Sequence, residues 1–386
     1  MRSVGIFTYS TLPRGSVVHA AALADALADA GWDVTLYALD KDRRGFYRPV
    51  RARLRLVPAA PAPATTSELV KLRAAELAAY LDDHDVAHDV HHAQDCLTAN
   101  GLLAARARGV PVTLVRTVHH VERFESPHLA ACQTRSIKEA ALCLAVSETA
   151  RRDVAATFGV DCDVVGNGVD ARRFEAVDAA RLAAVEARLG RGGPVVLAVG
   201  GVEPRKNTLR TLLAFAKLRA RHPAARLVIM GGATVLDHGA YRAAFDDALA
   251  TLPADTRRAV VELGVVPDDE VPAVYRCADV LALPSEQEGF GLAALEAMAA
   301  GVPVVASAQP PFTEFLDETC AVLVDPLSVD AVAEGLSRAL ADAPRLIHGG
   351  RARARRHGWD AVAARHLAPY ERISVHARDA LLRSLA

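Results

Sequence analysis

The sequence predicts two α/β domains, each built on a parallel β-sheet. The chain has 386 residues, more than one hydrophobic core usually organises, so two domains are expected. Near the N-terminus an apolar strand at 4–9 is followed by a loop, a helix at 17–30 that stops at Gly31, and a second strand at 34–37. Strand, loop, helix and strand in this order form a βαβ unit and imply parallel strands. The same architecture restarts with the continuous apolar run 195–200, which is typical of a buried parallel strand.

The composition excludes several classes of protein. Net charge is −1, so nothing favours nucleic acid or a broad membrane-binding surface. The six cysteines are scattered without a Cys-x-x-Cys pair, which fits neither a zinc site nor a disulfide framework and agrees with a reducing compartment. No signal-peptide pattern precedes the first strand, and no run of about 18 apolar residues is present. We therefore expect a cytoplasmic protein whose membrane contact is at most peripheral.

The rest of the first domain contains three informative segments. A Pro/Ala-rich stretch at 58–66 predicts an exposed loop. The segment 84–92 is dense in histidine, which makes a metal site the alternative to a short strand near 86–90, but no cysteine or clear ligand spacing supports it. A further strand over 112–120 ends in Thr-x-His-His with His119, and sites in parallel sheets lie at the carboxyl ends of strands.

In the second domain, the loop after the strand 195–200 carries two adjacent cations. Arg205 offers a two-pronged fork of donors and Lys206 a point charge, and both suit a diphosphate. A helix is predicted from Thr208, and further strands over 226–232 and 260–266.

The stretch 283–303 organises the second domain. It follows an apolar strand, reads as a loop through Gly289, and then as a short buried helix that ends at Gly301. Glu296 is a carboxylate in the middle of this helix and needs partners, and Glu288 precedes it by eight positions. The start of the helix should offer free backbone N–H groups to an anion, from Gly289, Phe290, Gly291 and Leu292.

Two other motifs compete for the function. Gly289-x-Gly291-x-x-Ala294 fits a dinucleotide fingerprint, but the next strand, 302–306, is not followed by the acid that would take a ribose hydroxyl. Asp-x-Asp matches at 40–42 and 161–163 could bind a divalent cation, but both fall in turn-rich places where Asp is common.

The stretch 283–303 resembles the glutamate pair of retaining glycosyltransferases of the GT-B fold, family 4 type, in Glu288, Glu296 and the flanking Pro-Ser, Glu-Gly-Phe-Gly and Gly-x-Pro-Val-Val. The resemblance implies that Glu296 holds the ribose hydroxyls of a sugar nucleotide and that Glu288 contacts the transferred sugar. It further implies that His119 lies beside that sugar, that Gly15 lies against the diphosphate with Arg205 and Lys206, and that main-chain groups near Val266 hold the base.

The resemblance extends over essentially the whole chain, with departures. Asn167-Gly168-Val169-Asp170, followed by Phe174, is similar to the signature that closes the first domain, although Gly166 replaces a proline. Arg14 replaces the first of two glycines, and Gly201 stands where an arginine is usual.

Together these features predict two Rossmann-like domains facing across a cleft. We expect an acceptor-side domain over 1–167, a connector over 168–193, a nucleotide-sugar domain over 194–365, and a helix over 366–386 that returns to the first domain. The resemblance implies a reaction that moves a hexosyl group from a nucleoside diphosphate sugar to a hydroxyl acceptor with retention, and we expect it to need no metal or other cofactor.

Some alternatives remain open. A non-catalytic sugar-nucleotide-binding protein, or a sugar-nucleotide epimerase on the same fold, would carry similar nucleotide contacts. The arginine run Arg351, Arg353, Arg355 and Arg356 is either a solvated helix face or a contact with anionic lipid headgroups.

Overall fold

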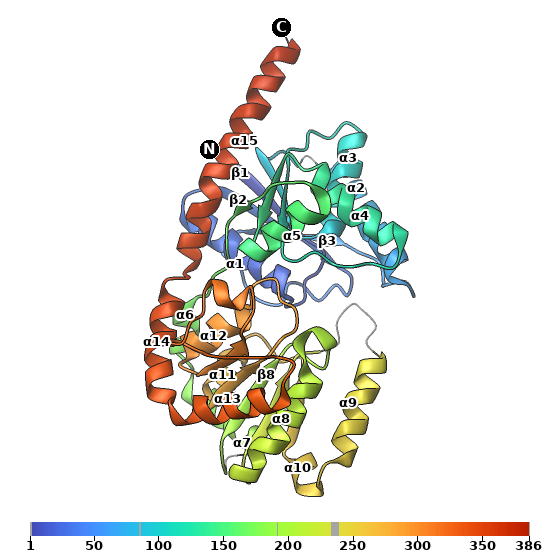
Figure 1. The fold of residues 1–386 in the computed structure, drawn as a ribbon. Coiled ribbons are helices and arrows are strands. Elements are labelled where there is room, and N and C mark those ends of the chain that lie inside the picture. Colours follow the sequence, from blue (N-terminus) through green and yellow to red (C-terminus); the bar gives the residue numbers. More distant parts are fainter. Residues whose placement is uncertain (1, 85, 191, 233–238, 386) are drawn as a thin grey trace. The chain divides into compact units, whose positions relative to one another are not determined.

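The computed structural model describes residues 2–84, 86–190, 192–232 and 239–385, and for 374–385 only the course of the helix. The chain divides into two compact units, 1–167 with 359–386, and 168–358. Each unit is an α/β structure with its own parallel sheet (Figure 1). The predicted architecture of two parallel-sheet units is therefore confirmed.

The described part of the first unit contains a seven-stranded sheet in which every printed pair is parallel, in the order β3-β2-β1-β4-β5-β6-β7. In the middle of the sheet, Ile6 lies between Leu36 and His92. The strands are β1 (Ser3–Thr8), β2 (Asp33–Asp40), β3 (Arg53–Pro58), β4 (Val90–Ala93), β5 (Leu114–Val118), β6 (Leu142–Ala145) and β7 (Asp163–Val164).

Helices cover this sheet, and local signals fix where several of them start. Thr65 and Glu68 form a capping box at the start of α2, and Ser147 caps α5. Leu23 and Leu27 of α1 share one core with Val362 and Tyr370 of α15, the long red helix in Figure 1. The helices are α1 (Gly15–Asp29), α2 (Thr66–Asp83), α3 (Cys96–Ala107), α4 (Pro127–Lys138), α5 (Glu148–Phe158) and α15 (Trp359–Leu385).

The described part of the second unit contains a six-stranded parallel sheet in the order β10-β9-β8-β11-β12-β13. Its central strands are almost wholly apolar because helices cover both faces. The strands are β8 (Val195–Val199), β9 (Arg226–Met230), β10 (Val260–Gly264), β11 (Val280–Leu283), β12 (Val304–Ser307) and β13 (Val322–Val324).

The helices of the second unit pack a core that includes Phe215 and Phe245, both fully buried. None of the helices in the described residues of either unit is long and apolar enough to cross a membrane. The helices are α6 (Ala171–Glu175), α7 (Ala179–Leu189), η1 (Pro204–Lys206), α8 (Thr208–Arg221), α9 (Gly239–Thr251), α10 (Ala254–Arg258), α11 (Val271–Arg276), α12 (Leu292–Ala300), η2 (Phe312–Glu314), α13 (Val329–Ala341) and α14 (Ala343–Arg355).

Several details differ from the sequence-based expectation. The short strand expected near 86–90 lies later in the chain, as β4. The edge strand β3 was not predicted, and its last residue, Pro58, falls where the loop 58–66 was expected to begin. The expected connector 168–193 contains α6 and α7, which pack on α12 and α11 and so belong to the second unit. The last helix begins at Trp359, and residues 359–365 belong to the first unit because Val362 and Ala363 are buried in its core.

Candidate functional site

The centre of the candidate site in the second unit is a cluster of alternating charges. The carboxylate of Glu288 accepts hydrogen bonds from Lys206 Nζ at 2.5 Å, Arg205 Nη1 at 3.0 Å and Ser285 Oγ at 2.9 Å. The second nitrogen of the Arg205 fork, Nη2, donates to Glu203 Oε1 at 2.9 Å. The structure therefore brings together three of the residues predicted from sequence, and it adds Glu203 and Ser285.

Burial makes these contacts strong. The Glu288 side chain is 6% exposed, against 14% for Lys206 and 34% for Arg205. Burial raises the pKa of Glu288, but the charges of Lys206 and Arg205 outweigh it and hold the pKa below its ordinary value. Glu288 is therefore an anion at neutral pH.

The backbone after β8 explains how the two cations reach Glu288. Gly200 has a φ of +120°, and a Cβ built there would lie 2.7 Å from Cε of Lys206. Glycine therefore leaves room for the lysine side chain to pack against this turn. Asn207 adopts the left-handed conformation, and its amide donates to the carbonyls of Pro284 at 2.9 Å and Pro326 at 2.7 Å. This asparagine therefore ties the cation loop to the loop that carries Glu288.

Glu296 has a different partner. It lies in α12, and its Oε2 accepts a hydrogen bond from the buried hydroxyl of Tyr275 at 2.6 Å. Burial raises the pKa of Glu296, and the Tyr275 bond and the charge of Arg173 offset this only in part. Phe174 packs edge-on against Tyr275 with ring centroids 5.5 Å apart. The Asn-Gly-Val-Asp-x-x-x-Phe signature thus ends in a residue that supports the tyrosine holding Glu296.

The helix N-terminus lies later than predicted. Helix α12 begins at Leu292 with Gly291 as its cap, so Gly289 and Phe290 belong to the turn before it. The ring of Phe290 stacks on Phe315 at 4.6 Å. Gly291 has a φ of +103°, and a Cβ there would lie 2.5 Å from the ring of Phe312, so this turn requires glycine. Of the four predicted N–H donors, Leu292 lies in the first turn of the helix, where N–H groups lack acceptors within the helix.

The loop after β10 leaves the second sheet at the carboxyl ends of its strands, as the loop with Arg205 and Lys206 after β8 does. Val266, expected to mark the base site, has a buried side chain, whereas its neighbour Val265 is 68% exposed. The backbone N–H of Gly231 donates to the carbonyl of Gly264 at 2.8 Å and joins this loop to the end of β9.

The first unit carries its own group of predicted residues. His119 follows β5, and its Nε2 lies 3.0 Å from Oε1 of Gln94, which follows β4. The His19 ring packs edge-on against His119 at 5.0 Å, and His19 Nδ1 lies 3.1 Å from Oδ1 of Asn167. Burial lowers the pKa of His119 well below its ordinary value, with a smaller effect from the neighbouring His19 and Arg116. His119 is therefore neutral at physiological pH, and we assign its proton to Nε2 because a carbonyl oxygen accepts there.

Gly15 is the first residue of α1, and a Cβ built on it would meet only open space. No packing among the described residues of the first unit therefore explains a glycine at this position.

The motifs that could indicate a metal have other partners. Within the described ranges, no group of three His, Cys, Asp or Glu side chains is arranged to hold a metal ion. Asp40 accepts hydrogen bonds from the backbone of its own loop, and Asp161 and Asp163 pair with Arg151 and Arg372.

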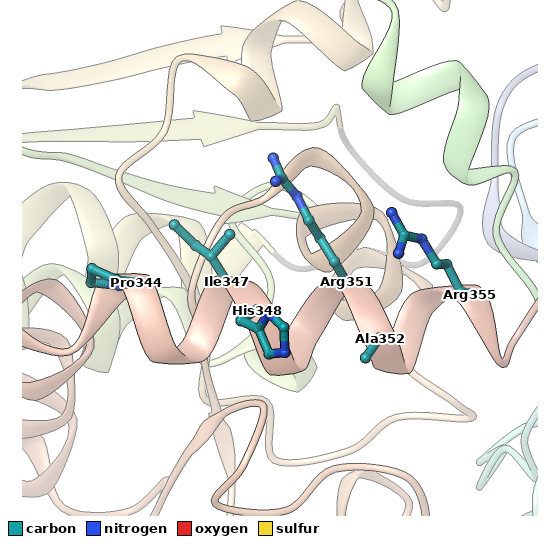
Figure 2. A pocket seen from close by; sticks show the side chains of 6 residues that line it. All are labelled: Pro344, Ile347, His348, Arg351, Ala352 and Arg355. Atoms are coloured by element: carbon teal, nitrogen blue, oxygen red, sulfur yellow. The ribbon is translucent and has the colours of Figure 1, made fainter.

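The arginine run lies on α14 and at its C-terminal end, and two of its side chains contact neighbouring segments of the second unit. A hollow of about 380 Å³ lies along this helix. Figure 2 shows the side chains of Arg351 and Arg355, two of the residues that line it, projecting from the same side of the helix. The Arg351 guanidinium lies over the C-terminal end of α12, where a Cβ on Gly301 would be 2.6 Å from it. This places a cation at the negative end of the helix that carries Glu296. Arg353 donates to the carbonyl of Phe315 at 2.5 Å.

Four residues of the site were missed by the sequence reasoning: Glu203, Ser285, Tyr275 and Gln94. Ser285 belongs to the Pro-Ser pair noted in the stretch 283–303, and Glu203 lies in the loop that carries Arg205 and Lys206. Tyr275 and Gln94 are distant in sequence from Glu296 and His119, so only the fold brings each pair together.

Two models of protein families match the chain. Residues 185–356 match the family model described as Glycosyl transferases group 1, and residues 13–173 match Glycosyltransferase Family 4. A D-inositol 3-phosphate glycosyltransferase of Xylanimonas cellulosilytica is 35% identical over 73% of this chain and 72% of its own length. An MMP alpha-(1->4)-mannosyltransferase of Mycolicibacterium hassiacum is 32% identical over 81% of this chain and 75% of its own. The match to the D-inositol 3-phosphate glycosyltransferase of Salinispora tropica, 34% identical, spans 61% of that protein.

Solved structures share the fold at low sequence identity. A sucrose-phosphate synthase from Thermosynechococcus elongatus has a TM-score of 0.78 at 20% identity and covers 97% of this chain and 100% of its own. Anabaena HepE, solved in complex with UDP-glucose, has a TM-score of 0.70 at 17% identity and covers 99% and 100%. Sequence relatives and structural neighbours agree, and the chain belongs to the group 1 glycosyl transferases and has the GT-B fold.

Proposed function

We propose that this glycosyltransferase moves a hexosyl group from a nucleoside diphosphate sugar to a hydroxyl acceptor, with retention of anomeric configuration and without a metal ion or other cofactor. The observation that carries the proposal is the cluster of Glu288 with Lys206 and Arg205. It places a carboxylate that can bind sugar hydroxyls within hydrogen-bond distance of two cations that can bind a diphosphate. The mannosyltransferase names among the relatives support a hexosyl donor.

In the proposed mechanism the chain acts mainly by electrostatics. The diphosphate gains negative charge as the glycosidic bond breaks, and Arg205, Lys206 and the N-terminus of α12 would stabilise it. A departing phosphate oxygen can take the proton of the acceptor hydroxyl, so no protein base is needed. Glu288 orients the sugar, Glu296 binds the ribose, and the neutral His119 offers Nδ1 as an acceptor to a sugar hydroxyl without adding charge.

The first test identifies the donor. Thermal shift with UDP-, GDP- and ADP-sugars should give stabilisation by one class, because a ligand that binds only the folded state raises the unfolding temperature. The proposal fails if none of these donors stabilises the protein at millimolar concentration.

The second test follows the reaction itself with the selected donor. In the presence of a hydroxyl acceptor, the anomeric proton coupling of the first product should match that of the donor. An inverted product would refute retention. Isomerised donor in the absence of acceptor would identify an epimerase, and binding without any turnover would identify a non-catalytic protein.

A further inference from the structure

Two buried cysteines lie side by side at one edge of the first sheet. Cys143 is in β6, and Cys162 immediately precedes β7. The parallel register pairs Leu144 with Asp163, so Cys143 and Cys162, one step earlier on each strand, lie opposite each other. Adjacent strands are about 4.8 Å apart, which is inside the roughly 4.4–6.8 Å range of Cα separations that a disulfide spans.

The two side chains also point to the same face. Both belong to one apolar cluster, and they are 4% and 6% exposed. Both cysteines are free. The parallel register and the shared cluster therefore place two free thiols side by side in the reduced protein.

The surroundings favour reaction at Cys143. Arg116 of β5 lies directly opposite Cys143 in the register and is itself buried. The neighbouring Cys162 thiol lowers the pKa of the Cys143 thiol, burial opposes this, and the charge of Arg116 lowers the pKa further. The thiolate is the reactive form of cysteine, and a nearby guanidinium favours it.

An oxidant can reach the two thiols because they lie at the edge of the sheet. Strand β7 has two residues and forms the edge of the sheet, so few backbone hydrogen bonds must open to expose Cys162. The chain then runs through Val165, whose carbonyl accepts from Arg365 at 2.6 Å, to Asn167, and enters the second unit at Gly168. A covalent bond here would tie down the last strand before the chain passes between units.

We propose that Cys143 and Cys162 form a reversible disulfide, an oxidative modification site at the end of the first unit. With the thiol oxidant diamide, the Cys143 thiolate adds to the N=N bond, Cys162 attacks the Cys143 sulfur, and the S–N bond breaks. Two thiols lose two electrons and two protons, and the N=N bond takes up both to become a hydrazine. Dithiothreitol reverses the reaction by thiol–disulfide exchange.

The experiment treats the native, fully reduced chain with diamide and maps its peptides after blocking of the remaining thiols. Trypsin should release residues 139–151 joined to residues 153–172, about 2 Da lighter than the sum of the two reduced peptides. The cross-link should leave four of the six cysteines alkylated, and dithiothreitol should abolish it.

Matched variants decide whether the pair is specific. Cys143→Ser and Cys162→Ser should each abolish the cross-link, whereas Cys320→Ser, a buried cysteine of the second unit, should keep it. The mapping of the unmutated chain stands even if one variant fails to fold. A cross-link that joins Cys96 to Cys132 instead, or that forms only after unfolding in urea, would overturn the proposal.

Discussion

Lys206 and Glu288 neutralise each other in the second unit: the ammonium group lies 2.5 Å from the carboxylate, and Arg205 contacts the other carboxylate oxygen. In the proposed reaction the cations bind the diphosphate while Glu288 binds the sugar. The diphosphate must therefore compete with Glu288 for the cations, and the carboxylate becomes available to the sugar as the cations turn to the phosphates.

The first prediction follows from this competition. Glu288→Gln keeps the size of the side chain but removes the negative charge that contacts both cations. Free nucleoside diphosphate should bind as tightly as before or up to about tenfold more tightly, a gain of about 1.4 kcal/mol, while kcat falls because the sugar is misplaced. Calorimetry and initial rates measure the two effects. Glu286→Gln, which changes an exposed carboxylate on the same loop, is the control. A tenfold loss of diphosphate affinity in Glu288→Gln would contradict the competition.

The second prediction concerns the cations themselves. Hydrogen bonds to charged groups are worth about 1.5–3 kcal/mol, so Lys206→Ala should lower kcat/KM by roughly 10–100-fold. Lys217→Ala removes a lysine that pairs with Asp330 at the surface and should have no effect. If the Arg205→Ala/Lys206→Ala double variant keeps its kcat/KM, the diphosphate binds elsewhere.

The sequence was sufficient to predict the two parallel sheets and most of their strands, for an identifiable reason. Continuous apolar runs such as 195–200 and 280–283 are typical of strands buried on both faces of a parallel sheet. The edge strand β3 was not predicted because its alternating Arg and Leu residues lack the continuous apolar character of the central strands.

The partners of the site residues could not be predicted from sequence. That Tyr275 holds Glu296, or that Gln94 faces His119, depends on how α11 packs on α12 and how β4 lies beside β5. The start of α12 was misplaced because Gly289 and Gly291 both suit a helix cap, and only the contact with Phe312 shows that Gly291 is the cap.

A third prediction follows from the buried histidines of the first unit. Burial lowers the pKa of His19 and His91 to about 4 and that of His366 to about 3. Below the ordinary value of about 6.5 the unfolded chain takes up protons that the folded chain refuses, so stability is full above pH 6.5 and falls as the pH drops toward 4. Each histidine should lower the free energy of unfolding by roughly 1.4 kcal/mol for each pH unit that the pH falls in that window.

Urea unfolding at a series of pH values between 7.5 and 5 tests this dependence. The slope of the free energy of unfolding against pH is proportional to the number of protons taken up on unfolding. His91→Phe should reduce that number by about one, because His91 is buried and neither ring nitrogen has a hydrogen-bond partner in the described structure. His348→Gln, at an exposed position of α14, is the control and should leave the slope unchanged. Equal stability of the unmutated chain at pH 7.5 and pH 5 would refute the prediction.

A fourth prediction addresses the proposed independence from metal. The negative charge of the leaving diphosphate is assigned to Arg205, Lys206 and the start of α12, so transfer should stay within about twofold after treatment with a chelator. Initial rates with EDTA, and again after excess Mn²⁺ or Mg²⁺, measure this. Loss of activity with chelator and its recovery with Mn²⁺ would show that an ion carries part of the charge.

The fifth prediction concerns Glu296, which we assign to the ribose. Glu296→Gln replaces a doubly accepting carboxylate with an amide that accepts at one atom and donates at the other. Binding of the sugar nucleotide and of the free nucleoside diphosphate should both weaken, by about 1–3 kcal/mol. Calorimetry on Glu288→Gln and Glu296→Gln with the same nucleoside diphosphate separates the two glutamates. An equal loss in both variants would show that this division of labour is wrong.

Tyr275 gives this assignment a pH dependence. Burial raises the pKa of Glu296, and the hydroxyl of Tyr275 partly offsets that rise. Tyr275→Phe should therefore raise the pKa further, and the affinity for nucleoside diphosphate should begin to fall at a higher pH than in the unmutated chain, because the protonated acid loses an acceptor site. The hydroxyl of Tyr241 accepts a hydrogen bond from the backbone N–H of Leu209. Tyr241→Phe is therefore the control for the loss of a tyrosine hydroxyl in the same unit. If the pH profile of binding is the same in Tyr275→Phe as in the unmutated chain, the ribose is not held by the ionised Glu296.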